Sequence, residues 1–396
     1  MTATQTADGT TAVDRSAPPA SWWAVGALAL GIFTLVTAEF LPASLLSPMA
    51  HDLGVSEGMA GQTVTVTALM GAVTAPTLAI LLPRTDRRVV MVGLTALALV
   101  SNLLVAISPG LVTVLLARLL LGVALAGFWA MVLAVTAQLV APDHLGRAMM
   151  VVNSGVSLAT VLAVPVGAFL GELWGWRWVF VAAGGTAVLA LVAQLVTLPR
   201  LPVTSSGSLR ILLETARRRI VLVGMTATAL IAGGHFAGFT YLRPALDRVP
   251  LLTAAGLAGL LAAYGAASFV GNILSGLLAD KRLRLLVVAA PVLIGVATVT
   301  LALGGTSYAL VAATVVLWGI GFGGIPTAVQ TWIARVAPDR LESMGGLFVA
   351  TFQIAIALGA AVGGLVVDAF DVRTALVLGG VAAVLGGALL GAARRV

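Results

Sequence analysis

Apolar runs, each near the length of a membrane-crossing helix, alternate with short polar breaks along almost the whole chain. A hydrocarbon core about 30 Å thick requires roughly 20 helical residues. The pattern therefore predicts an all-α membrane protein with twelve transmembrane helices. Cutting the sequence at its charged or Pro/Gly-rich breaks places the spans at 22–46, 60–82, 89–108, 112–139, 148–172, 177–198, 220–243, 254–279, 285–304, 308–334, 343–367 and 374–393.

The composition supports this class. Hydrophobic residues make up 60% of the chain and charged residues 9%, and the mean hydropathy is +1.09, which excludes a water-soluble globule. In a soluble protein the net charge of +7 would suggest a nucleic-acid partner. Here the basic residues set topology, so we expect a lipid bilayer and no nucleic acid as partner. The absence of cysteine excludes disulfides, thiolate metal sites and a cysteine nucleophile.

Basic residues divide unequally between the two sets of alternate loops. Because loops on the cytoplasmic side collect Lys and Arg, we expect both termini in the cytoplasm and a multi-pass protein of the inner (plasma) membrane. The polar residues 1–21 lack a basic segment and a cleavage site, and we predict a disordered cytoplasmic tail there. The poor set holds Arg177, Arg248 and Arg373, and the rich set holds Arg15, Arg84, Arg87, Arg88, Arg147, Arg200, Arg210, Arg217, Arg218, Arg219, Lys281, Arg282, Arg284, Arg335, Arg340, Arg394 and Arg395.

The chain repeats itself at an offset of about 196 residues. "APDHL" at 141–145 matches "APDRL" at 337–341, and "VGAFLGE" at 166–172 matches "VGGLVVD" at 362–368. At the same offset "EFLPASLLSP" (39–48) lies over "HFAGFTYLRP" (235–244). The repeat predicts two six-helix bundles of equal orientation, an N-terminal one at 22–198 and a C-terminal one at 220–396, joined by a cytoplasmic linker at 199–219.

One acidic residue lies well inside a predicted span. Glu39 is about seven residues from the outer end of the first span, hence roughly 10 Å below that surface. An ionised carboxylate there costs a few kcal/mol or more, which favours a group that takes and releases a proton. A neutral carboxyl that only holds helices together is the alternative. Arg118, in the fourth span, lies at nearly the same depth.

The repeat pairs Glu39 with His235, at the same depth in the seventh span. Histidine donates, accepts and titrates near neutral pH, although a lone histidine is more often a satisfied hydrogen-bonding group. A polar amide or indole that faced lipid would leave its hydrogen bonds unused. We therefore expect a substrate cavity lined by His235, Phe40, Phe128, Trp129, Asn272, Trp318, Gln330 and Gln353.

Several motifs together resemble the major facilitator superfamily. "GLLADKRLR" (276–284) is similar to its signature loop, and "AILLPRTDRR" (79–88) is a more divergent first-half copy. "RLLLGVALAG" (118–127) and "VPVGAFLG" (164–171) resemble its Arg-x-x-x-Gly and antiporter motifs, although Val164 replaces the usual glycine. Within the superfamily the chain looks most like the sugar and nucleoside efflux permeases of the twelve-span drug/proton antiporter branch.

That resemblance implies a monomeric secondary transporter that exports a small organic solute, such as a sugar, nucleoside or drug, in exchange for protons. In the family, the arginine at position 118 lies close to the acid at position 39 and helps to set its proton affinity. The signature loops form a cytoplasmic gate, in which Asp280 meets a helix N-terminus or an arginine. The gate residues implied are Arg84, Arg87, Arg88, Asp280, Lys281 and Arg284.

Other classes of function fit less well. A proton/solute symporter or a facilitator has the same architecture and stays open as an alternative. No P-loop, GxSxG or HExxH motif occurs, and the three histidines lie far apart in the sequence, so we expect neither an enzyme nor a cofactor nor a metal site. A purely structural or signalling membrane protein has no need of an intramembrane acid such as Glu39.

Overall fold

The computed structural model describes residues 21–203, 208–246, 254–304 and 307–393, and these residues form helices and no strands. The first group of helices, which we call the N-half, comprises α1 (Trp22–Ser44), α2 (Leu46–Leu53), α3 (Glu57–Leu81), α4 (Arg87–Ala106), α5 (Leu111–Leu139), α6 (Leu145–Trp174) and α7 (Trp176–Thr197). After the linker helix α8 (Leu209–Arg217), the C-half comprises α9 (Arg219–Phe239), α10 (Leu242–Leu246), α11 (Ala254–Leu303), α12 (Tyr308–Val336), α13 (Leu341–Ala369) and α14 (Val372–Ala392). Two short 3₁₀ turns, η1 (Pro142–His144) and η2 (Pro338–Arg340), precede α6 and α13.

The predicted all-α membrane architecture is confirmed. Eleven helices in the described ranges are long and apolar enough to cross a membrane. One of them, α11, has 50 residues, and at 1.5 Å per residue it would be about two and a half times the thickness of a bilayer core. Its backbone is non-helical at Arg282, with φ −134° and ψ 43°. Since the chain turns there, α11 supplies two spans, and their break falls between the two spans predicted at 254–279 and 285–304.

Two predicted spans end earlier than expected, at equivalent places in the two halves. The span at 22–46 stops at Ser44 and continues as α2, and the span at 220–243 stops at Phe239, before α10. Pro48 and Pro244 explain both breaks, because proline has no N–H to donate to the carbonyl four residues earlier. The carbonyls left without that donor belong to residues 44 and 240, where the helices end.

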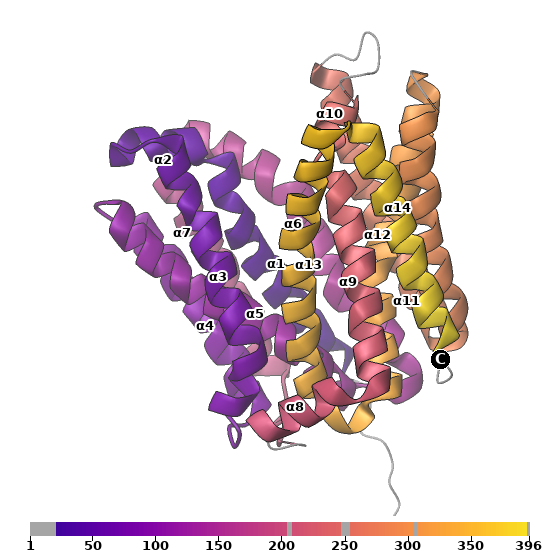
Figure 1. Ribbon diagram of the computed structural model, residues 1–396. Coiled ribbons are helices and arrows are strands. Elements are labelled where there is room, and N and C mark those ends of the chain that lie inside the picture. Colours follow the sequence, from indigo (N-terminus) through magenta and orange to yellow (C-terminus); the bar gives the residue numbers. More distant parts are fainter. Residues whose placement is uncertain (1–20, 204–207, 247–253, 305–306, 394–396) are drawn as a thin grey trace, which may run out of the picture.

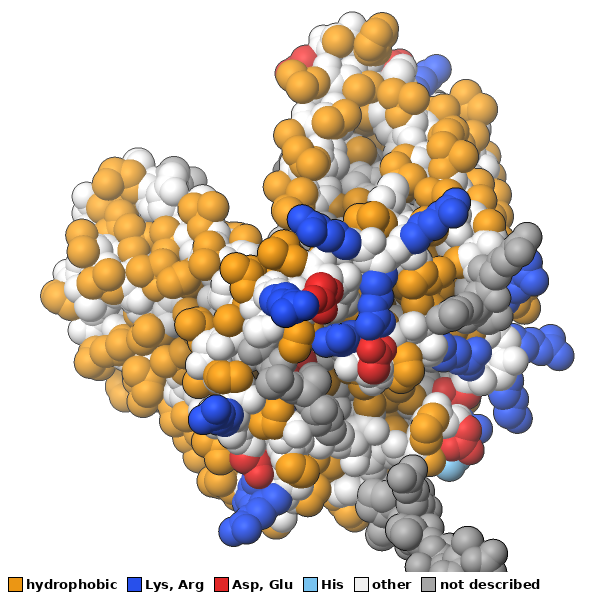
Figure 2. Space-filling view, turned by 60° about the horizontal axis from the view of Figure 1, so that its bottom comes forward, with side chains coloured by type: hydrophobic (Ala, Val, Ile, Leu, Met, Phe, Trp, Pro, Cys, Tyr) orange, Lys and Arg blue, Asp and Glu red, His pale blue; other side chains and the backbone are white. Residues whose placement is uncertain are grey.

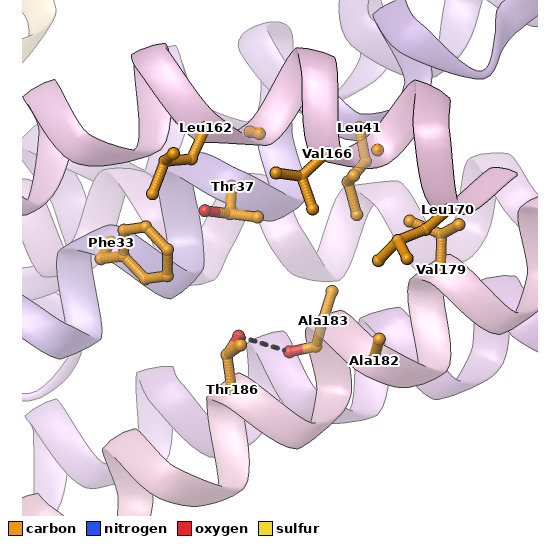
Figure 3. Close-up of a pocket in the computed structure, with 12 residues that line it drawn as sticks. Phe33, Thr37, Leu41, Leu162, Val166, Leu170, Val179, Ala182, Ala183 and Thr186 are labelled. Carbon is orange, nitrogen blue, oxygen red and sulfur yellow. Dashed lines mark hydrogen bonds between the residues drawn. The ribbon is translucent and has the colours of Figure 1, made fainter.

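Two apolar grooves on the outside of the bundle demonstrate the internal repeat. The first, of about 200 Å³, lies between α1, α6 and α7, and is lined by twelve residues that include Phe33, Thr37 and Leu162 (Figure 3). The second lies between α9, α13 and α14. Each of the twelve residues has a counterpart 196 positions later in the second groove, as Phe33 has Ala229. The repeat read from short sequence matches thus extends to the packing of whole helices.

The two halves meet at one end of the molecule and diverge at the other. The meeting end carries the start of α1, the linker with α8 and the end of α14, and Lys and Arg side chains gather on it (Figures 1 and 2). We call it the arginine-rich face. There α13 lies directly against α5, since a Cβ added to Gly345 would be 2.0 Å from the carbonyl oxygen of Ala130. Toward α2 and α10 the halves separate, and a notch is visible between them in Figure 2.

The sequence-predicted tail at 1–21 falls almost entirely outside the described residues, and only Ser21 is placed. The linker at 199–219 contains α8, a helix that was not predicted from the sequence. The limits predicted for the two bundles, 22–198 and 220–396, remain predictions, although α1 begins at Trp22 and α9 at Arg219.

Candidate functional site

The Arg118 side chain on α5 ties three helices of the N-half together. It is completely buried, and its Nη1 donates to the carbonyl of Ala38 at 2.8 Å. Nη2 donates to the carbonyl of Glu39 at 3.4 Å, and Nε to that of Thr63 on α3 at 3.3 Å. Ala38 lies four residues before Pro42, which has no N–H to offer its carbonyl. The guanidinium therefore supplies the donor that the proline removes from α1.

The carboxyl group of Glu39 takes no part in the hydrogen bonds of Arg118. Its side chain is half-buried, and Arg118 bonds to its backbone oxygen. Within the described residues, no ion pair joins its carboxylate to an arginine. The structure thus brings the two residues of the expected proton site together, but through the main chain of α1. A half-buried carboxyl beside a fixed positive charge is suited to exchange a proton.

His235 lies at the centre of an aromatic cluster in the C-half. Its side chain is only 1% exposed, and its Nδ1 accepts a hydrogen bond of 2.9 Å from Nε1 of Trp318. Phe322 stacks on the imidazole at a centroid distance of 3.6 Å, and Phe239 lies against it at 5.1 Å. Two residues predicted to line a cavity, His235 and Trp318, are therefore brought together, although both are buried.

Asn272 belongs to a polar bridge between the halves. Its Nδ2 donates to the carbonyl of Met150 on α6 at 2.9 Å, and its Oδ1 accepts from the hydroxyl of Thr327 on α12 at 2.9 Å. The Thr327 oxygen in turn accepts from Nδ2 of Asn153 on α6 at 2.8 Å. Asn153 and Thr327 were not among the residues predicted from the sequence. Two isolated polar residues in apolar spans gave no sign that they would meet.

The other predicted cavity residues lie in different surroundings. Phe128 is fully buried against α1, since a Cβ added to Gly31 would be 2.8 Å from its ring. That places it inside the N-half and away from the gap between the halves. Gln330 is 2% exposed, and its Oε1 has no hydrogen-bond partner. The side chains that remain half-buried are those of Phe40, Trp129 and Gln353.

Asp280 joins the halves at the arginine-rich face. Its side chain is 4% exposed and accepts from the backbone N–H groups of Gly146, at 2.6 Å, and Arg147, at 3.3 Å, in the first turn of α6. Free N–H groups at a helix start favour an anion. A Cβ on residue 146 would lie 2.6 Å from Oδ1 of Asp280, so only glycine allows this approach. Arg335 donates to the Asp280 carbonyl at 2.6 Å.

A second junction at this face uses a buried ion pair. Nε and Nη2 of Arg87 donate to the two carboxylate oxygens of Glu342, both at 2.5 Å, and the side chains are 1% and 2% exposed. Arg87 also donates to the carbonyls of Leu82 and Thr85. Arg87 was predicted from the sequence as a gate residue, but Glu342 was not. The repeat could have located it, because position 342 is the counterpart of Gly146 at the offset of 196.

The remaining predicted gate residues have smaller or no structural roles. Arg88 donates to the carbonyl of Leu195, within the N-half, and Arg284 to that of Gly391, within the C-half. The side chains of Arg84 and Lys281 are exposed. Only Asp280 and Arg87 of the predicted set therefore bridge the two halves. In the part of the chain that the structure describes, no group of three His, Asp or Glu side chains is arranged to hold a metal ion.

Two helical halves that are joined at one face by separable contacts and diverge at the other are the arrangement of a solute transporter. The chain belongs to the Major Facilitator Superfamily, whose family model matches residues 28–342 and 251–395. It is thus a multi-pass membrane transporter, as the motifs indicated.

Known relatives and solved structures agree with this family. The chain is 38% identical over 360 residues to the purine ribonucleoside efflux pump NepI of Salmonella typhimurium and to that of Salmonella typhi, and covers 91% of each. Two solved structures share the fold. FucP in the outward conformation has a TM-score of 0.78 at 16% identity, with 94% of this chain and 99% of that chain covered. The human organic anion transporter MFSD10 has a TM-score of 0.77 at 16% identity, with 94% and 100% covered.

Proposed function

We propose that the chain exports purine nucleosides from the cell in exchange for protons, by alternating access. The observation that carries the substrate class is the 38% identity, over 91% of both chains, to purine ribonucleoside efflux pumps. The proton coupling rests on Glu39, a half-buried carboxyl within a membrane-spanning helix, with the fixed charge of Arg118 beside its main chain.

The orientation follows from the basic residues. With seventeen Lys and Arg residues in one set of loops and three in the other, the arginine-rich face is the cytoplasmic one, and both termini lie in the cytoplasm of a cell bounded by its inner membrane. In that orientation the end at which the two halves separate faces the outside of the cell. In this proposal, substrate leaves the protein, and a proton enters it, in the outward-open state.

Glu39 couples the movement of protons to the movement of substrate. In the outward-open state it takes a proton from outside, and the neutral carboxyl is then cheaper to enclose when the halves close over it. Once the path opens inward, the proton leaves, and the charged carboxylate disfavours closure until substrate is bound. Arg118 keeps the α1 segment around Ala38 and Glu39 in place throughout, because its three hydrogen bonds go to backbone carbonyls.

The two junctions at the arginine-rich face form the inner gate. Asp280 on the start of α6, and Glu342 on Arg87, must both release before the path opens to the cytoplasm. The Asn153, Thr327 and Asn272 bridge lies next along the same interface and must part with them. All three junctions connect an N-half helix to a C-half helix, as a rocking movement of the halves requires.

The test is transport of radiolabelled inosine in proteoliposomes with an imposed pH gradient. Vesicles with the wild-type protein are expected to accumulate inosine against its concentration gradient when protons flow outward down their own gradient. When the pH gradient is reversed, inosine is expected to flow out of the vesicles. Glu39→Gln is expected to lose accumulation while keeping inosine exchange at zero pH gradient, since Gln mimics the protonated form. Undiminished accumulation by Glu39→Gln would remove Glu39 from the mechanism.

Arg177→Gln is a suitable control for this experiment. Arg177 pairs with Asp52 at the outer end of the N-half, and both side chains are partly exposed. Its replacement is expected to leave the direction of coupling unchanged. Inosine movement in the same direction as protons would identify a symporter, and movement that ignores the pH gradient would identify a facilitator.

A further inference from the structure

The aromatic cluster around His235 has two layers. The inner layer consists of His235, Trp318 and Tyr264, which are 1%, 0% and 8% exposed. The outer layer consists of Phe236, Phe239, Phe322 and Phe352, which are half-buried. Ring centroids in the outer layer lie 5.8 Å apart for Phe236 and Phe322, and 6.3 Å apart for Phe236 and Phe352. We call Phe236, Phe322 and Phe352 the aromatic shelf.

The cluster occurs in one half only, although the two halves share their helix packing. At the offset of 196, Trp318 corresponds to Gly122 and Tyr264 to Ala68. Phe239, Phe322 and Phe352 correspond in turn to Ala43, Ala126 and Val156, and His235 to Glu39. Only Phe236 has an aromatic counterpart, Phe40. If these rings merely filled a bundle of this shape, the N-half would need them too, so their restriction to the C-half indicates a task of that half alone.

The Phe352 ring of the shelf lies on the side of α13 that faces the N-half. Gly345 on α13 touches Ala130 of the N-half at the arginine-rich face. Phe352 is seven residues farther along α13, hence two turns away on the same side of the helix. The Phe352 ring is half-buried.

The hydrogen bond from Trp318 fixes the chemistry of His235. An indole N–H can only donate, so the Nδ1 that accepts from it carries no proton. The neutral imidazole must then carry its hydrogen on Nε2, which makes Nε2 a donor. Among the described residues Nε2 has no hydrogen-bond partner. His235 thus offers one fixed donor beside a set of flat apolar rings, and its accepting nitrogen is not free to take a proton.

We propose that the aromatic shelf binds the purine base of the transported nucleoside, with His235 Nε2 donating to an acceptor atom of the base. A purine presents a wide π face for stacking, together with ring nitrogen acceptors, and this combination fits flat rings next to a fixed N–H donor. The inference rests on the nucleoside specificity proposed above. In this proposal the C-half binds the base, and the N-half binds and releases the proton through Glu39.

The test is binding of inosine by the purified full-length chain, measured by calorimetry, with ribose as a probe that lacks the base. Phe352→Leu and Phe236→Leu are each expected to raise the Kd for inosine by about fivefold to a hundredfold, since each removes one stacking ring. Phe352→Tyr keeps a ring and is expected to stay near the wild-type Kd. Phe169→Leu is the matched control, because that side chain lies on α6, outside the aromatic cluster, and is 61% exposed.

The role of His235 is tested separately with Trp318→Phe, which keeps a ring but removes the indole donor that fixes the imidazole. Its Kd for inosine is expected to rise, while its thermal unfolding shows whether the fold is intact. If the wild-type chain binds inosine and the Phe352→Leu and Phe236→Leu variants bind it within twofold of wild type, the shelf is not the base site, and the proposed function stands. If the wild-type chain binds ribose as tightly as inosine, the shelf has no part in recognition. If it binds and transports no purine nucleoside, the proposed function fails and this inference fails with it.

Discussion

Pro42 and Arg118 act as one structural element although they lie on different helices. The proline leaves the Ala38 carbonyl without its helical donor, and the buried guanidinium replaces that donor from α5. An unpartnered carbonyl in the interior of a membrane protein would cost about 1 to 3 kcal/mol. Arg118 therefore stabilises the main chain around Glu39, and the expected pairing of their side chains is not needed to explain its burial.

A double-mutant cycle tests this relation. Arg118→Lys is expected to lower inosine transport sharply, because one ammonium group cannot reach three carbonyls on α1 and α3. Pro42→Ala restores an N–H to the Ala38 carbonyl, so the loss caused by Arg118→Lys should be smaller in the Pro42→Ala background. We expect a coupling free energy of about 1 to 2 kcal/mol in thermal or denaturant unfolding. Additive effects of the two changes would show that Arg118 does not serve the carbonyl freed by Pro42.

At the scale of elements, the starts of α6 and α13 each join the two halves, but with charges of opposite sign. At α6, free backbone N–H groups hold the Asp280 carboxylate. At α13, the counterpart of Gly146 is Glu342, an acid on the helix itself, and its partner is Arg87. The first-half loop lacks the signature aspartate and carries Arg84 at the counterpart of Asp280. The loop "AILLPRTDRR" departs from the family motif in having a base where the motif has an acid. The acid lies on the partner helix instead.

Removing one partner of this pair should favour the inward-open state. Glu342→Gln leaves the buried guanidinium of Arg87 without its counter-charge, at a cost of about 3 to 5 kcal/mol in the closed arrangement. Since the chain has no cysteine, spin labels can be attached at Arg84→Cys and Lys281→Cys, whose native side chains are exposed and lie on opposite halves. The distance between the labels is expected to lengthen in Glu342→Gln. Arg88→Gln, which loses a contact only within the N-half, should leave it unchanged.

The sequence predicted the elements better than their local chemistry. Hydropathy located every span and the break at 280–284, because membrane burial imposes a strong length requirement. It overlooked α8, whose nine residues mix charged and apolar positions and are too short to cross a bilayer. Glu342 was overlooked because it lies just before the predicted span at 343–367. Phe128 was assigned to the cavity because α5 is apolar on all sides, so no pattern distinguishes its inner from its outer surface.

For the molecule as a whole, the close packing at the arginine-rich face and the open wedge at the other are two ends of one rigid-body arrangement. The halves can rock only if the contacts at the first end are short and separable. Among the described residues, the tightest contact between the halves is at Gly345, where α13 lies against the main chain of α5. A side chain at that position cannot be accommodated by a rotamer change, since it would meet a backbone oxygen.

Gly345→Ala is therefore expected to shift the whole molecule toward the inward-open state. The distance between spin labels at the outer ends of the halves, on His51→Cys and Tyr308→Cys, should shorten relative to wild type. Both native side chains are exposed. Gly26→Ala, at an exposed position where an added Cβ meets nothing within 4 Å, is the matched control. An unchanged distance in Gly345→Ala would mean that this contact does not hold the face closed.

The depth of the Arg87 and Glu342 pair has one more consequence, which concerns ionic strength. Mobile ions screen charges that water can reach, over about 8 Å at physiological salt, but they do not enter a site that is 1% to 2% exposed. The pair of Arg218 and Asp339 on the same face is 38% and 55% exposed and open to such screening. Osmotic swings that change the salt around the arginine-rich face should therefore weaken its surface pairs and leave its buried pair, and with it the balance between the two open states, almost untouched.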